Sequence, residues 1–112
     1  MAKGGFDAVV DSYLSTSHRD SLRPICPFAA LGSEMARSGK ETKTAATEVL
    51  QTLFVTLAGD APDREQARSD AIVALSTMIG AMTLARVVSN SALSAEILAR
   101  AKVHLYRHAG PH

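Results

Sequence analysis

Hydrophobic residues recur every three or four positions in five successive segments of the chain, which is the spacing of an amphipathic α-helix. Polar residues, glycine or proline separate the segments, and no stretch alternates as a half-buried strand would. The predicted helices cover Phe6–Thr16, Pro27–Ser38, Lys40–Ala58, Asp63–Ser89 and Ser94–Leu105. The pattern therefore predicts an all-α fold. A length of 112 residues suits one domain, here residues 1–112, with a modest core.

Two of the predicted helices carry recognisable start signals. Asp63 is followed three residues later by Gln66. This spacing is typical of a capping box, in which the side chain of each residue accepts a hydrogen bond from the backbone N–H of the other. Ser94 is the expected N-cap of the last helix. In that helix Glu96 and Arg100 are four residues apart, so we expect them to form an ion pair on its exposed side.

The most informative segment is the run between Asp70 and Arg86, which contains no charged residue. A helix that is apolar nearly all round must be buried on more than one side. A chain with five short helices has little material to surround it, so a second copy of the chain is the simplest cover. Gly80 in its middle costs about 1 kcal/mol relative to alanine, and close approach of another backbone is the usual compensation.

Helical spacing divides this segment into two unlike faces. We expect the bulky face to point into the domain; it comprises Ile72, Leu75, Met78, Ile79 and Met82. We expect the smaller face to meet a partner helix; it comprises Val73, Thr77, Gly80, Ala81, Leu84 and Val88. The stripe of Leu98, Ala101 and Leu105 on the last helix is expected in the same interface. The sequence thus predicts a homodimer, and the alternative is that both faces are core of one monomer.

Composition and charge restrict the class of protein. The chain is 46% hydrophobic and 21% charged with a formal net charge of +1, and its basic residues are mixed with acidic ones. It therefore has no basic face for a nucleic acid. The uncharged run is shorter than the ~20 residues that span a bilayer and contains Ser76, Thr77 and Thr83. We expect no signal peptide, since the first residues lead directly into a polar amphipathic helix, and the single Cys26 fits a reducing compartment. We expect a cytoplasmic protein without a membrane segment.

Few residues are candidates for chemistry. Cys26 lies at the predicted start of a helix, where the helix dipole lowers a thiol pKa, so it is a candidate redox site; the alternative is a small buried hydrophobe. His104 and His108 have a spacing that suits a metal, but no acid or cysteine lies nearby in sequence, which favours packing at the edge of the interface. We therefore expect no metal site.

Arg86 ends the uncharged run and is expected to form an ion pair with Glu34 or Glu96, or alternatively to bind a ligand carboxylate. No arrangement of residues resembles a nucleophile elbow or another catalytic motif. We therefore expect neither an enzyme nor a cofactor.

Three blocks of residues together resemble a known family. They are Tyr13-Leu14-Ser15 followed by His18-Arg19-Asp20; Cys26-Pro27-Phe28-Ala-Ala-Leu-Gly-Ser-Glu34-Met-Ala-Arg37; and Gly80-Ala-Met-Thr-Leu-Ala-Arg86 followed by Ala92-Leu-Ser-Ala-Glu-Ile-Leu98. In order and spacing they resemble the C-terminal regulatory domain of TetR-family transcriptional regulators. The similarity extends from about Phe6 to Leu105.

The resemblance implies a five-helix regulatory domain of a transcriptional repressor, dimerising as a four-helix bundle made by the last two helices of each subunit. It also implies a small-molecule effector bound between the first four helices. The helical pattern offers apolar side chains for this site, which are Phe28, Met35, Phe54, Leu75, Met78 and Met82. The helix-turn-helix module of that family is absent, so we expect DNA contact only through such a missing domain. The alternative function is a helical dimerisation module with no small-molecule ligand.

Overall fold

The computed structural model describes residues 5–20, 34 and 36–108. Within these ranges the chain forms helices and no strand, which confirms the all-α class. The helices are α1 (Gly5–Tyr13), α2 (Thr16–Asp20), α4 (Lys40–Ala58), α5 (Arg64–Val87) and α6 (Ser91–His108). Of the predicted helix at 27–38, residues 34 and 36–38 are described, whereas the other eight positions and the side chains of Cys26, Phe28 and Met35 lie outside the described residues.

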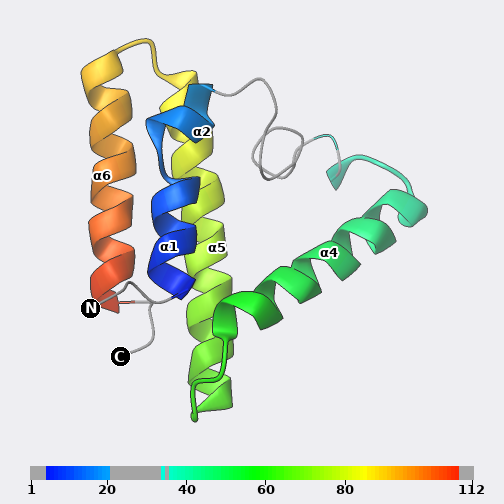
Figure 1. The fold of residues 1–112 in the computed structure, drawn as a ribbon. Helices are drawn as coiled ribbons and strands as arrows, with labels where there is room; N and C mark the ends of the chain where they lie inside the picture. Colours follow the sequence, from blue (N-terminus) through cyan, green and yellow to red (C-terminus); the bar gives the residue numbers. More distant parts are fainter. Residues whose placement is uncertain (1–4, 21–33, 35, 109–112) are drawn as a thin grey trace.

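Helices α5 and α6 form an antiparallel hairpin that is the centre of the fold (Figure 1). Helix α1 packs along one side of this hairpin, α2 sits near its closed end, and α4 runs away from α5 at a steep angle (Figure 1). Each of these helices contacts the hairpin, α1 through α6, and α2 and α4 through α5. One face of the hairpin is thereby covered by the rest of the described chain.

The core lies where α1, α5 and α6 meet. Helix α5 contributes eight buried residues, and five of them are alanines, which allow α6 to approach closely. Met78 and Met82 are the large side chains that α5 adds to the core, and both are fully shielded from solvent. The other members of the core cluster come mainly from α1 and α6, namely Phe6, Val10, Tyr13, Leu14, Leu98 and Leu105.

The capping box expected at the start of α5 is only half formed. At the start of α5 the Asp63 carboxylate accepts a hydrogen bond from the Gln66 backbone N–H at 3.0 Å, which confirms the cap. The Gln66 side chain does not return the bond, because its Nε2 donates to the Asp70 carboxylate at 2.9 Å. The cap is therefore one-sided, and Gln66 instead joins the first two turns of the helix.

The start of α6 differs from the prediction. The helix begins at Ser91, and the Asn90 side chain accepts from the Leu93 N–H at 2.9 Å, so Asn90 occupies the N-cap that was expected at Ser94. Ser94 lies inside the first turns, where its hydroxyl donates to the Ala85 carbonyl of α5 at 2.7 Å. Serine occurs both as an N-cap and as a residue that bonds a neighbouring helix, so the residue type alone does not distinguish the two roles.

The predicted first helix is split in two. Helix α1 ends at Tyr13, and α2 begins at Thr16. The Ser15 hydroxyl accepts from the His18 N–H at 3.0 Å, so Ser15 starts the second helix as its N-cap. Helical structure therefore extends to Asp20, four residues beyond the end predicted at Thr16.

Candidate functional site

The side of α5 that faces away from the other described helices is apolar and open. Arg68 and Arg86 mark the covered side, because Arg68 lies over the Phe54 ring of α4 at 5.9 Å and Arg86 contacts α2. Helical spacing puts Val73 and Leu84 on the opposite side, where their exposed fractions are 51% and 56%. This is the face that the sequence analysis predicts for a partner. The bulky face of α5, which was expected to point into the domain, is only partly internal, since Ile72 is 36% exposed.

Gly80 lies on this open side of α5. A Cβ atom built on Gly80 meets nothing within 4 Å, so no element of the described chain explains the missing side chain. Thr77 and Val88 on the same side are half-buried, whereas Ala81 is buried against the core. We name the exposed apolar side of α5 formed by Val73, Thr77, Gly80 and Leu84 the open face.

On α6 the predicted interface stripe is largely wrong. Leu98 and Leu105 are buried in the chain's own core, with exposed fractions of 3% and 0%, and only Ala101 is half-exposed. The reason is that these leucines face α5 and α1, which supply the hydrophobic partner that the sequence analysis assigned to a second subunit. Lys102, whose Nζ lies 4.0 Å from Asp11 of α1, marks the covered side of α6.

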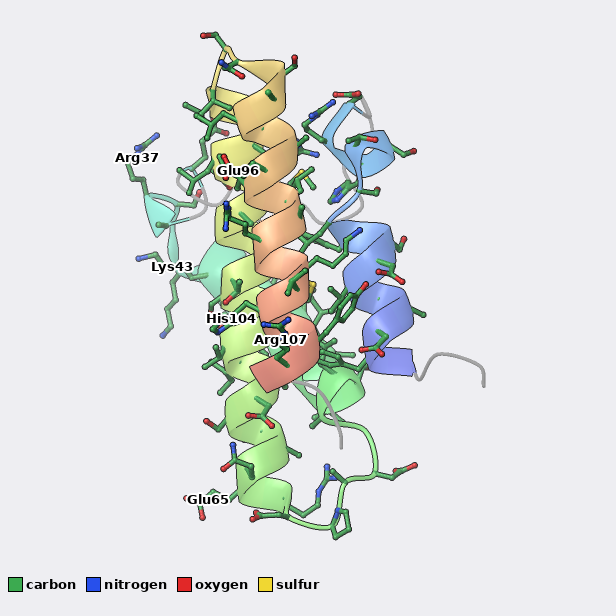
Figure 2. All side chains as sticks on the ribbon, turned by 90° about the vertical axis from the view of Figure 1, so that its left-hand side faces the viewer. Arg37, Lys43, Glu65, Glu96, His104 and Arg107 are labelled. Carbon is green, nitrogen blue, oxygen red and sulfur yellow. The ribbon has the colours of Figure 1, made fainter. Side chains whose placement is uncertain are left out.

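The opposite side of α6 continues the open face. Helical spacing brings Leu93, Ile97, Arg100 and His104 to this side, and Leu93 is 43% exposed. Glu96, His104 and Arg107 lie on the side of α6 away from α1 (Figure 2). Glu96 forms the predicted ion pair with Arg100 at 2.7 Å, which confirms that expectation.

A cluster of polar contacts fixes α2 to the closed end of the hairpin. Arg86 of α5 donates from Nη2 to the His18 carbonyl at 3.0 Å and from Nε to the Arg19 carbonyl at 3.3 Å. The ion pair expected for Arg86 is therefore replaced by bonds to the last turn of α2, whose carbonyls have no partner within the helix. Sequence spacing could not reveal this, since 67 residues separate the two groups.

Arg19 extends the cluster to α6. Its Nη1 donates to the Ser94 hydroxyl at 3.0 Å, and its Nε donates to the adjacent Asp20 carboxylate at 2.9 Å. The hydrogen bonds from Arg19 lower the pKa of the Asp20 carboxyl below its usual value. Together with Arg86 and Ser91, these residues line a shallow pocket of about 280 Å³ in which both guanidinium groups already donate to acceptors of the chain itself. We interpret the cluster as structural.

His18 is the residue of this cluster that the sequence analysis missed. Its ring is buried, Nδ1 donates to the Tyr13 carbonyl at 2.7 Å, and the ring meets the Tyr13 ring edge to face with centroids 4.6 Å apart. The turn between α1 and α2 is therefore closed by a side chain of α2 itself. The only sequence signal was the presence of His18 within one of the three family-like blocks.

Replacing Arg86 with alanine is expected to lower the free energy of unfolding by about 1–3 kcal/mol, because two partly buried carbonyls lose their donors. The measurement is chemical denaturation followed by circular dichroism. Arg64→Ala is a matched control, since Arg64 also donates to two carbonyls, those of Gly59 and Ala61, but at an exposed site. Equal losses for the two variants would contradict the structural role of Arg86.

The described residues expected around an effector fall into two groups. Leu75, Met78 and Met82 of α5 belong to the core cluster. Phe54 of α4 is half-buried and packs against that cluster together with Leu50, Leu53 and Leu57. Helix α4 has no buried residue, so this side of α4 is the part of the expected site that solvent reaches.

By length and composition, α5 is long and apolar enough to cross a membrane, since its most apolar stretch of 18 residues has a mean hydropathy of 1.4. Core helices of soluble proteins meet the same criterion, and α5 carries the buried residues of this domain, so this property alone does not assign the chain to a membrane. No protein-family model, curated protein sequence or solved structure matches the chain.

Proposed function

We propose that this chain is the regulatory domain of a TetR-type transcriptional repressor, which dimerises through α5 and α6 and binds a small, largely apolar effector. The observation that carries the proposal is the open face, where Val73 and Leu84 are exposed on the helix that also forms the core. Burying a large aliphatic side chain contributes about 1.5–3 kcal/mol, so a second copy placed on this face gains substantial stability. Such an obligate interface buries on the order of 2,000 Å² or more.

The effector part of the proposal rests on α4. This helix meets α5 through a half-buried apolar side that includes Phe54 and Leu57, and it lacks any buried residue that would fix it there. An apolar molecule between α4 and α5 would favour one arrangement of the two helices over another, which is how an effector shifts a population of states. Contact with DNA would need a separate domain, because this chain has mixed surface charge and a net charge of only +1. The proposed location is the cytoplasm.

Light scattering coupled to size-exclusion chromatography tests the dimer. The chain has a mass of 11.8 kDa, and we expect twice that mass at tens of micromolar. A monomer throughout this concentration range would contradict the proposed function, since the open face would then have no second copy to cover it.

A thermal-shift screen with lipophilic compounds tests the effector. A ligand that binds only the folded state at about 100 times its Kd stabilises that state by about 2.7 kcal/mol, which raises Tm. Phe54→Ala should reduce this rise, while Val55→Ala on the exposed side of α4 should preserve it. A dimer whose Tm responds to no compound would favour the second candidate, a helical dimerisation module. That candidate is supported by the complete burial of Met78 and Met82.

A further inference from the structure

A groove of about 340 Å³ runs along the outer side of α6 and is lined by Ala99, Arg100, Val103, His104 and Arg107. Ala99 and Val103 give the groove small apolar side chains, and its three polar residues are all basic. It borders the open face of α5, because His104 lies on the uncovered side of α6 (Figure 2) and helical spacing puts Arg100 on the same side. A partner that covers the open face would therefore also meet this groove.

Charge along α6 is asymmetric. Glu96 lies near the beginning of the helix, and Arg107 lies near its end (Figure 2). The Glu96 carboxylate is held in place by Arg100 at 2.7 Å. Within the part of the chain that the structure describes, no carboxylate lies within ion-pair distance of Arg107. A parallel second copy of α6 would place like charges together, whereas an antiparallel copy places Glu96 beside the partner's Arg107.

The open face of α5 has the same kind of symmetry. Val73 and Leu84 lie at equal distances in sequence on either side of the pair formed by Thr77 and Gly80. An antiparallel second copy of α5 therefore sets Val73 against the partner's Leu84 and brings the smallest residues together at the crossing. Gly80 allows the two backbones to approach closely there, and the structure leaves the space above it open.

One two-fold axis satisfies both arrangements. The contact between the Ser94 hydroxyl and the Ala85 carbonyl fixes the register of the hairpin. In an antiparallel hairpin, each step back along α5 corresponds to one step forward along α6. The midpoint between Thr77 and Gly80 on α5 therefore lies beside the midpoint between Glu96 and Arg107 on α6. The two points agree to within about one residue, or roughly 1.5 Å along the axis. Two independent patterns, one apolar and one charged, thus indicate the same axis.

We propose that a second copy of this chain docks on the open face about this two-fold axis, which lies between the two open faces and perpendicular to the helix axes. In this arrangement α6 is antiparallel to the partner's α6, and Glu96 of each subunit is paired with the partner's Arg107. This inference rests on the proposed dimer and specifies its geometry. Because the contact is isologous, each dimer contains the ion pair twice, and a single substitution changes both copies.

Charge reversal tests the pairing through the dimer Kd, measured by sedimentation equilibrium. Glu96→Arg and Arg107→Glu should each weaken the dimer roughly fivefold to fiftyfold, since two exposed attractions become repulsions. The double variant should return to within about threefold of the wild type. Asp7→Lys on α1, which packs on the other side of the hairpin (Figure 1), is the control and should leave Kd unchanged.

A cross-linking experiment reports the geometry directly. In a Cys26→Ser background, an equal mixture of Glu96→Cys and Arg107→Cys chains should form disulfide-linked dimers under mild oxidation, and each chain alone should form far fewer. A dimeric wild type in which the reversals are additive and the mixture does not cross-link would overturn this geometry alone. A monomeric wild type would overturn the proposed function and this inference together.

Discussion

Replacing Met78 with alanine is expected to lower the free energy of unfolding by about 2–5 kcal/mol, which is a large part of the stability of a domain of this size. Met78 has no exposed surface and lies at the centre of the cluster formed by α1, α5 and α6. Truncating it removes apolar contacts and leaves a cavity that the surrounding helices fill only in part. Urea denaturation of the variant, at a concentration where the oligomeric state is known, measures the loss.

Met78→Trp distinguishes a packed core from an effector cavity at the same position. In a close-packed core the larger ring causes strain, so we expect a loss of about 1–3 kcal/mol. Val55→Ala serves as the control, because Val55 is 63% exposed and its truncation should change stability little. If Met78→Trp were mild and abolished a ligand-induced rise in Tm, Met78 would line the effector site rather than the core.

Gly80→Arg is expected to convert the dimer into a monomer. The added side chain projects from the open face, where the structure has free space around Gly80 within one chain. The monomer should therefore fold normally, while a second α5 can no longer approach. Light scattering should show the mass of a single chain at concentrations where the wild type is dimeric, and circular dichroism should show unchanged helix content.

Gly80→Ala separates the two roles of this glycine. Within one chain it should stabilise α5 by up to about 1 kcal/mol, because alanine favours helix and its Cβ meets nothing. Across a close helix crossing the same methyl group should weaken association. A Gly80→Arg variant that remains dimeric would show that the partner covers another surface.

The helix pattern was largely predictable from sequence, because long amphipathic segments carry a strong periodic signal. The bounds of α4 agree with the expected Lys40–Ala58, where Gly39 precedes the helix and Gly59 ends it with a positive φ of 59°. The buried side of α5 was also predicted in its main members, Met78 and Met82. Periodicity determines which residues share a face, and this is sufficient for the core of a central helix.

Periodicity does not determine what each face contacts, and this is where the prediction of α6 failed. Leu98 and Leu105 form a good apolar stripe, but α1 and α5 of the same chain cover it. The role of Arg86 was hidden for a related reason, since backbone carbonyls carry no sequence signal and any residue type offers one. Effector-site residues Phe28 and Met35 lie outside the described residues and stay a prediction.

The polar cluster around Arg86 has a consequence for the order of folding. Helices α5 and α6 are neighbours in sequence, so their hairpin closes a short loop and can form early. Helix α2 is only five residues long and is held by contacts to residues 67–75 positions away, between Arg86 and the His18 carbonyl and between Arg19 and Ser94. Those contacts require closure of a long loop, and they can form only after α5 and α6 have packed as a hairpin. The N-terminal helices should therefore dock last, onto the hairpin that the C-terminal half of the chain has already formed.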